Sequence, residues 1–211
     1  MNKADVIKRI REIGIIPVVR ATSTDEAMRA IDAIREGGIS VLEITMTVPN
    51  AFSVIEQVTT RFGSDALIGA GTVLDAEDAK SCIASGAQFI VSPALNLDTI
   101  AYCREQDVAV MPGALTPTEV VQAWNAGADF VKIFPAGAVG GPSYLKALKA
   151  PLPQLELVPT GGVSLKTAAD FIKAGAAALG VGSDLLAGES AAITERAKQY
   201  VEIVRQAREE L

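Results

Sequence analysis

Short apolar runs alternate with amphipathic segments from one end of the chain to the other. Apolar runs bounded by turn residues are typical of buried strands, and apolar positions that recur every three to four residues are typical of helices. The runs predict eight strands, near residues 15–20, 41–45, 67–71, 88–92, 108–112, 129–134, 155–160 and 177–182. The segments between and after them predict eight helices, near 24–37, 51–61, 75–85, 97–106, 116–126, 142–149, 165–174 and 190–209.

Eight strands alternating with eight helices favour a single (β/α)8 TIM barrel of the α/β class. The charged amphipathic segment Met1–Ile10 predicts an extra N-terminal helix and not a secretion signal. An open doubly wound sheet would carry a glycine fingerprint after its first strand, which here ends in Arg20-Ala21-Thr22-Ser23. The length of 211 residues fits one domain, so residues 1–211 are expected to form one barrel.

A repeat refines this expectation. A glycine that ends a helix, where a left-handed residue is favoured, precedes four of the strands: Gly38, Gly86, Gly127 and Gly175. Five positions later the repeat brings four residues to equivalent heights: Glu43, Val91, Lys132 and Gly180. Alternate strands supply one interior layer of such a barrel, so Glu43 should face Lys132, with room for a ligand beside Gly180.

Composition and charge narrow the classes of function. The net charge is −6 without a long basic run, which argues against nucleic acid as a partner. No segment approaches the roughly 18 apolar residues of a membrane span, and a cytoplasmic protein is expected. Cys82 and Cys103 lack metal-ligand spacing and are interpreted as idle thiols, with a ligand pair or disulfide as the alternative. The chain has no histidine, which excludes Ser-His-Asp and Cys-His catalysis.

Lys132 is the leading candidate for catalysis. It interrupts the apolar run Phe130–Phe134, and strand alternation places it on one face with Phe130 and Phe134. A lysine buried there is costly unless it is paired or used. Burial favours the neutral amine, which can attack a ketone and form an iminium, an electron sink for carbon–carbon cleavage. A structural lysine at the ragged end of an edge strand is the alternative.

The other candidates also lie at strand ends, where barrel enzymes carry their active sites. Glu43 is the candidate proton shuttle, with a structural ion pair to Lys132 or Arg20 as the alternative. The planar guanidinium of Arg20 suits a substrate carboxylate, although a solvated surface arginine fits the sequence equally well. Thr45 and Thr72 are candidate hydroxyl partners.

Two glycine-rich turns follow the last two strands, as Pro159-Thr160-Gly161-Gly162 and Gly180-Val181-Gly182-Ser183. Backbone N–H groups of such turns can approach a phosphate closely, and phosphate sites recur at this place in barrel enzymes. Tight turns without a ligand are the alternative. Pro93 and Phe134 would wall the pocket or else only pack in the core.

The ordered motifs resemble those of one enzyme family. They are Glu43-Ile44-Thr45, Gly69-Ala70-Gly71-Thr72-Val73, Val91-Ser92-Pro93, Met111-Pro112-Gly113, Lys132-Ile133-Phe134-Pro135 and Pro159-Thr160-Gly161-Gly162. Over essentially the whole chain they resemble the 2-keto-3-deoxy-6-phosphogluconate (KDPG) aldolase / 4-hydroxy-2-oxoglutarate aldolase family, the Entner–Doudoroff aldolases. The resemblance implies a homotrimeric barrel with a lysine Schiff base, no metal and no other cofactor. The implied reaction is reversible cleavage of the keto-deoxy sugar phosphate to pyruvate and glyceraldehyde 3-phosphate.

The resemblance also implies roles for individual residues. Lys132 matches the Schiff-base lysine, Glu43 the general acid/base, and Thr72 a threonine at the pyruvyl end. Pocket walls are matched by Pro93 and Phe134. The region for the substrate hydroxyls and phosphate is matched by Thr160, Gly161, Gly162, Gly182 and Ser183. Many members carry a carboxylate-binding arginine where this chain has Thr47, and others have one at the end of strand one, so Arg20 is expected to take that role.

Other functions fit the same residues. The change at Thr47 leaves the galactonate epimer and unphosphorylated keto acids open as substrates. A phosphosugar isomerase or epimerase would use Glu43 as base and Lys132 as an electrostatic group, and a non-catalytic trimeric scaffold would keep only a vestigial pocket. For an aldolase the partners are a small keto acid and an aldehyde phosphate, with no nucleic acid and no membrane.

Overall fold

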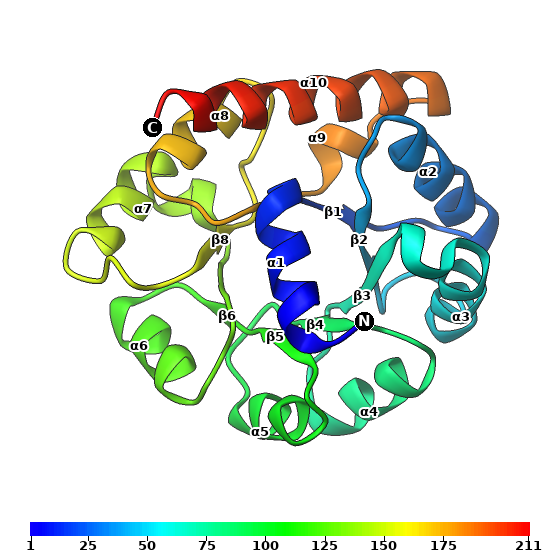
Figure 1. Ribbon diagram of the computed structural model, residues 1–211, viewed down its shortest axis with the longest axis horizontal. Coiled ribbons are helices and arrows are strands. Elements are labelled where there is room, and N and C mark those ends of the chain that lie inside the picture. The colour runs from blue at the N-terminus through cyan, green and yellow to red at the C-terminus, as the bar shows by residue number, and fades with distance from the viewer.

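A computed structural model describes all residues of the chain, 1–211, as alternating strands and helices (Figure 1). The strands are β1 (Ile15–Val19), β2 (Val41–Thr45), β3 (Leu67–Gly71), β4 (Phe89–Val91), β5 (Ala109–Met111), β6 (Gly113–Ala114), β7 (Val131–Ile133), β8 (Leu157–Pro159) and β9 (Leu179–Val181). The helices are α1 (Lys3–Ile13), α2 (Thr24–Glu36), α3 (Ala51–Phe62), α4 (Ala76–Ala84), α5 (Leu97–Glu105), α6 (Pro117–Asn125), α7 (Pro142–Lys149), α8 (Ala168–Lys173), α9 (Ser183–Leu186) and α10 (Ser190–Glu209). Short 3₁₀ turns lie at Gly63–Asp65 and Ala136–Val139. All the predicted regions are present, and the sequence did not predict α9 or the 3₁₀ turns.

The strands form two curled parallel sheets. One has the order β5-β4-β3-β2-β1-β9 and the other the order β6-β7-β8. The strand predicted at 108–112 is divided at Pro112, which has no N–H to donate to a neighbouring strand. Two isolated parallel bridges, Leu157 with Ala176 and Thr160 with Gly180, join the region of β8 to that of β9. The helices other than α1 surround the strands (Figure 1).

Side-chain alternation along the strands separates two apolar cores. The larger core joins the outer faces of the strands to the surrounding helices. The inner core gathers residues such as Val41, Phe89 and Phe130 and is completed by Val6 and Ile10 of α1. Figure 1 accordingly shows α1 lying across the middle of the ring of strands. Because Phe130 belongs to the inner core, Lys132 lies on the same inner face.

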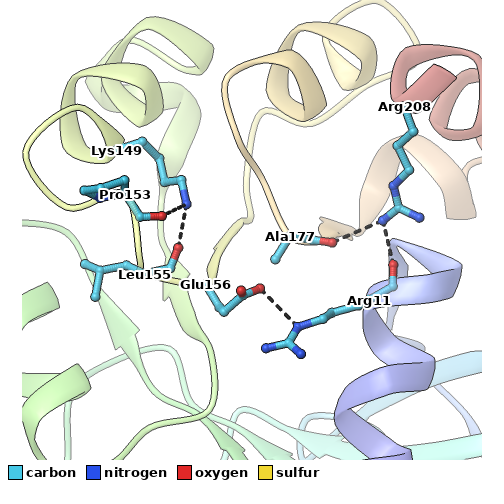
Figure 2. A network of polar contacts seen from close by, with 7 residues as sticks. All are labelled: Arg11, Lys149, Pro153, Leu155, Glu156, Ala177 and Arg208. Carbon is cyan, nitrogen blue, oxygen red and sulfur yellow. Dashed lines mark hydrogen bonds and ion pairs between the residues drawn. The ribbon is translucent and has the colours of Figure 1, made fainter. Parts of the chain in front are cut away.

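A polar network ties the two terminal helices to the N-terminal ends of the strands (Figure 2). Arg208 of α10 donates hydrogen bonds to the carbonyl oxygens of Arg11 and Ala177, at 2.7 and 3.2 Å. Arg11 pairs with Glu156 at 3.3 Å. Gly14, which ends α1, is left-handed with φ 70°, and a Cβ there would overlap the Arg208 guanidinium. The N-terminal ends of β8 and β9 are therefore held to α1 and α10.

The four glycines of the repeat all have a left-handed backbone conformation, which confirms the prediction for the helix ends. The φ angles are 95°, 102°, 95° and 96° for Gly38, Gly86, Gly127 and Gly175.

No helix is both long enough and apolar enough to cross a membrane.

Candidate active site

Glu43 and Lys132 face each other across the inside of the curled sheets. Glu43 lies on β2 and Lys132 on β7, and each residue is 2% exposed. The Lys132 Nζ lies 3.9 Å from the Glu43 Oε1. This is the arrangement that the repeat predicted. The alternative of an edge-strand lysine is wrong, because β7 is the central strand of its sheet.

The Glu43 carboxyl is removed from solvent, and neighbouring groups only partly replace the stabilisation that water would give its charged form. Its Oε1 is buried without a hydrogen-bond partner. Burial raises the pKa of Glu43, and the positive charges of Lys132 and Arg20 oppose that rise without cancelling it. A carboxyl in this setting holds its proton more readily than one in water, which favours a role as a proton donor.

Gly71 on β3 makes room for the Glu43 side chain. A Cβ built on Gly71 would lie 1.9 Å from the Glu43 Oε1 and 2.5 Å from its Cγ and Cδ. Any larger residue would displace the carboxyl group. The sequence contained the glycines of β3 as a motif, but nothing in it indicated which side chain needs the space.

The aromatic ring of Phe134, which faces the open part of the site, lies close to the Lys132 amine. Its Nζ lies 5.4 Å from the centroid of the half-buried Phe134 ring, close enough for a cation–π interaction when the amine is charged. The Thr160 hydroxyl fills the position that a Gly180 Cβ would take. Gly180 nevertheless lines the cavity described next, so room for a ligand does lie beside it.

A cavity of about 550 Å³ opens at the C-terminal ends of the strands. Seven residues singled out in the sequence line it: Arg20, Phe134, Thr160, Gly161, Gly162, Gly182 and Ser183. Five that were not singled out as site residues complete the wall: Val18, Val163, Gly180, Leu186 and Ala187. The catalytic candidates Glu43 and Lys132 are not part of this wall and lie deeper on the inner face.

Arg20 follows β1 at the rim of this cavity. It is exposed and forms no ion pair, yet its charge is near enough to lower the pKa of Glu43. The guanidinium is thus available to a ligand anion between the cavity and the buried pair.

Three further candidates lie outside the cavity wall. Thr72 is half-buried and left-handed, with φ 60°, a conformation that costs a β-branched residue about 1–3 kcal/mol and is found mostly at functional sites. Thr45 is buried, and its hydroxyl donates to the Val19 carbonyl oxygen at 3.0 Å and lies 2.7 Å from the Thr47 hydroxyl. Half-buried Pro93 packs its backbone against Gly113. The Thr45 hydroxyl is therefore hydrogen-bonded to the last residue of β1, directly before Arg20.

The two glycine turns are built differently. Gly161 and Gly162 both have φ 81°, a left-handed conformation that suits glycine, and the Gly161 carbonyl oxygen accepts a hydrogen bond of 2.8 Å from the Gly137 N–H. Gly182 immediately precedes α9, whose first residue is Ser183. Both turns present backbone groups to the same cavity.

Several known proteins with similar sequences are aldolases. A sequence model of the KDPG and KHG aldolase family matches residues 6–205. The chain is 37% identical over 199 residues to a 2-dehydro-3-deoxy-6-phosphogalactonate aldolase of Escherichia coli (strain K12), covering 93% of this chain and 97% of that protein. It is 32% identical over 205 residues to a 2-dehydro-3-deoxy-phosphogluconate aldolase of Treponema pallidum (strain Nichols), covering 94% and 97%.

Among solved structures, a KDPG aldolase from Legionella pneumophila with pyruvate captured at low pH as a covalent carbinolamine intermediate is similar, with a TM-score of 0.81 and 28% identity. The similarity covers 96% of this chain and 97% of that chain.

Proposed function

The chain belongs to the KDPG and KHG aldolase family, and we propose that it is a class I, metal-independent aldolase that reversibly cleaves KDPG to pyruvate and glyceraldehyde 3-phosphate. The observation that carries this proposal is the buried pair of Lys132 and Glu43, 3.9 Å apart on the inner face. Cleavage of 4-hydroxy-2-oxoglutarate to pyruvate and glyoxylate would use the same pair.

The reaction begins at Lys132. Its neutral Nζ attacks the C2 carbonyl of the keto acid and gives a carbinolamine, which loses water to form an iminium. Glu43 supplies the proton that turns the carbinolamine hydroxyl into a leaving water molecule, a role favoured by its raised pKa. The carbinolamine of pyruvate captured in the Legionella relative supports this step.

Cleavage follows from the iminium. The Glu43 carboxylate takes the proton of the C4 hydroxyl, the C3–C4 bond breaks, and its electron pair moves into the iminium to give an enamine. Glyceraldehyde 3-phosphate is released as the C4 hydroxyl becomes its aldehyde. Protonation of the enamine at C3 and hydrolysis by water then release pyruvate and restore the Lys132 amine.

The two anionic ends of the substrate are assigned to different parts of the site. We assign the carboxylate to Arg20 and Thr72, because the Arg20 guanidinium is unpaired at the rim and close to Glu43. We assign the hydroxyls and the phosphate of the substrate to Thr160 and to two turns that line the same cavity, Gly161-Gly162 and Gly182-Ser183. Thr45, Pro93 and Phe134 border the pyruvyl end.

The galactonate epimer of KDPG is the second candidate substrate. The 37% identity to the phosphogalactonate aldolase is close to the 32% and 36% identities to two phosphogluconate aldolases, so both epimers fit the sequence similarity. Coupled assays with each epimer at equal concentration discriminate the two, and a higher kcat/KM for the galactonate would reassign the substrate without changing the mechanism.

We further propose that residues 1–211 form one domain in which both sheets close into a (β/α)8 barrel. The bridges between the β8 and β9 regions support closure on one side, and the single residue Pro112 separates β5 from β6 on the other.

A homotrimer is proposed from the family resemblance. It is supported by exposed apolar side chains at the starts of successive helices: Phe52, Leu74 and Leu97. The double variant Leu74→Asp/Leu97→Asp should sediment as a monomer.

Trapping with borohydride tests the central proposal. Incubation with pyruvate and borohydride should add one reduced pyruvate at Lys132, and the variant Lys132→Met should gain no mass. Lys149 is an internal control, because its ammonium is held by the carbonyl oxygens of Pro153 and Leu155 (Figure 2). A wild-type protein that stays unmodified at Lys132 would remove the Schiff-base mechanism.

A further inference from the structure

The short helix α9 is held in place by two residues of α10. Helices of four residues have too few internal hydrogen bonds to be stable alone, so the position of α9 depends on its neighbours. The Tyr200 hydroxyl donates a hydrogen bond of 2.6 Å to the Asp184 Oδ2 in the first turn of α9. At the other end, the Arg196 guanidinium donates to the carbonyl oxygens of Leu185, at 3.0 Å, and of Ala187.

These contacts form one unit that lies behind the cavity wall. Arg196 and Tyr200 are four residues apart and therefore share a face of α10. Tyr200 is fully buried, and neither residue lines the cavity. The segment that they hold begins directly after Gly182 and includes Ser183, both of which do line it.

We propose that Arg196 and Tyr200 are positioning residues that set the preference for substrates with a distal phosphate. This inference rests on the proposed function, which places that phosphate at the turns of Gly161 and Gly182. Anion binding by several backbone and hydroxyl groups needs them held to about half an ångström, which depends on locked supporting contacts. Loss of either anchor lets Gly182 and Ser183 shift away from the phosphate.

The reacting end of the substrate is independent of this unit. Lys132 and Glu43 lie on β7 and β2 and touch neither α9 nor α10 in any hydrogen bond or ion pair. A displacement of α9 should therefore weaken the use of phosphorylated substrate and leave the chemistry of an unphosphorylated one unchanged. A purely structural role would lower both alike.

The test compares KDPG with the same keto-deoxy acid lacking its phosphate. In Tyr200→Phe, which keeps the ring and removes the hydroxyl, the ratio of the two kcat/KM values should fall about fivefold to tenfold. Asp184→Ala should lower it by a similar factor, and the double variant should fall no further, because both changes remove the same hydrogen bond. Asp184→Asn should keep the ratio, since its amide oxygen can still accept from Tyr200.

Matched controls separate positioning from general damage. Tyr144→Phe, on α7, removes a tyrosine hydroxyl that donates to the Leu115 carbonyl oxygen, and it should leave the ratio unchanged. Arg205→Met should also leave the ratio unchanged, because Arg205 lies on α10 but pairs only with Glu202 and Glu209. Arg196→Met, which removes the second anchor of α9, should lower the ratio. Should Tyr200→Phe fail to fold, Asp184→Ala tests the same bond.

An unchanged ratio in Tyr200→Phe and Asp184→Ala, or an equal loss with both substrates, would overturn the positioning role. Lys132 would still be trapped by pyruvate in that case, and the proposed function would stand. A wild-type protein that is not trapped and cleaves neither substrate would instead overturn the proposed function, and this inference with it.

Discussion

Replacing Gly71 by alanine should disable the site while leaving the fold in place. The backbone of Gly71 is an ordinary strand conformation that alanine can adopt, so only space is at issue. The new methyl group would lie 1.9 Å from the Glu43 Oε1, whereas ordinary contacts begin at 3.4 Å. The carboxyl oxygen must therefore move by about 1.5 Å to reach an ordinary contact distance.

The size of the effect follows from this displacement. A misplacement of about 1 Å in a catalytic group can cost on the order of a hundredfold in rate, so kcat for KDPG cleavage should fall by about that factor or more. Overpacking the interior should lower the free energy of unfolding by only about 1–3 kcal/mol, or the midpoint of thermal unfolding by roughly 2–12 °C. Pyruvate release coupled to lactate dehydrogenase measures kcat, and thermal unfolding followed by circular dichroism measures stability.

Gly69→Ala is the matched control. It makes the same change on the same strand and face, but its methyl group would collide with the Phe89 ring and not with Glu43. It should lose stability and keep most of its kcat. A folded Gly71→Ala protein with wild-type kcat, or an equal loss of kcat in both variants, would show that the position of the Glu43 carboxyl does not control the reaction.

Three other outcomes are expected. Burial raises the pKa of Glu43 above 4.5, so the native protein binds this proton more tightly than the unfolded chain does. The contribution of Glu43 to the free energy of unfolding should therefore fall as the pH rises from about 4.5 through the raised pKa. Glu43→Gln should lose that slope in urea unfolding over the pH range just above 4.5, and an unaltered slope there would contradict the desolvated setting. Arg20→Lys should raise KM about tenfold, because a lysine cannot bind a carboxylate through two parallel hydrogen bonds, whereas Arg29→Lys should leave KM unchanged. Equal KM values in the two variants would place the carboxylate elsewhere. Burial raises the pKa of both Cys82 and Cys103 to about 12, so neither should react with a thiol reagent at pH 8 until the chain is unfolded, and fast labelling of the native protein would refute this.

Much of the fold followed from local patterns. The period of two in the strands and of about 3.6 in the helices is written in neighbouring residues, so the alternation of elements was predictable. The same alternation placed Lys132 on the inner face with Phe130, and the repeat placed Glu43 opposite. The end of the fifth strand at Pro112 was predicted, whereas the two-residue strand β6 that follows it was not, because so short a strand shows no alternation.

The details of the site depended on contacts between distant residues. Thr160 takes the position that a Gly180 side chain would occupy, and the Thr45 hydroxyl donates a hydrogen bond to the Val19 carbonyl oxygen. A strand pattern indicates neither contact. The helix α9 is too short to show a period, and its place depends on side chains of α10.

The sequence by itself determined the order of the elements, the face on which each strand residue lies and the family to which the chain belongs, because these depend on residue type and short spacing. Only the tertiary structure decided that Gly71 gives the Glu43 carboxyl its space, that this carboxyl lacks a hydrogen-bond partner, and that α10 holds one wall of the cavity. Those properties arise from distances and solvent exclusion between segments that the chain brings together only when it folds.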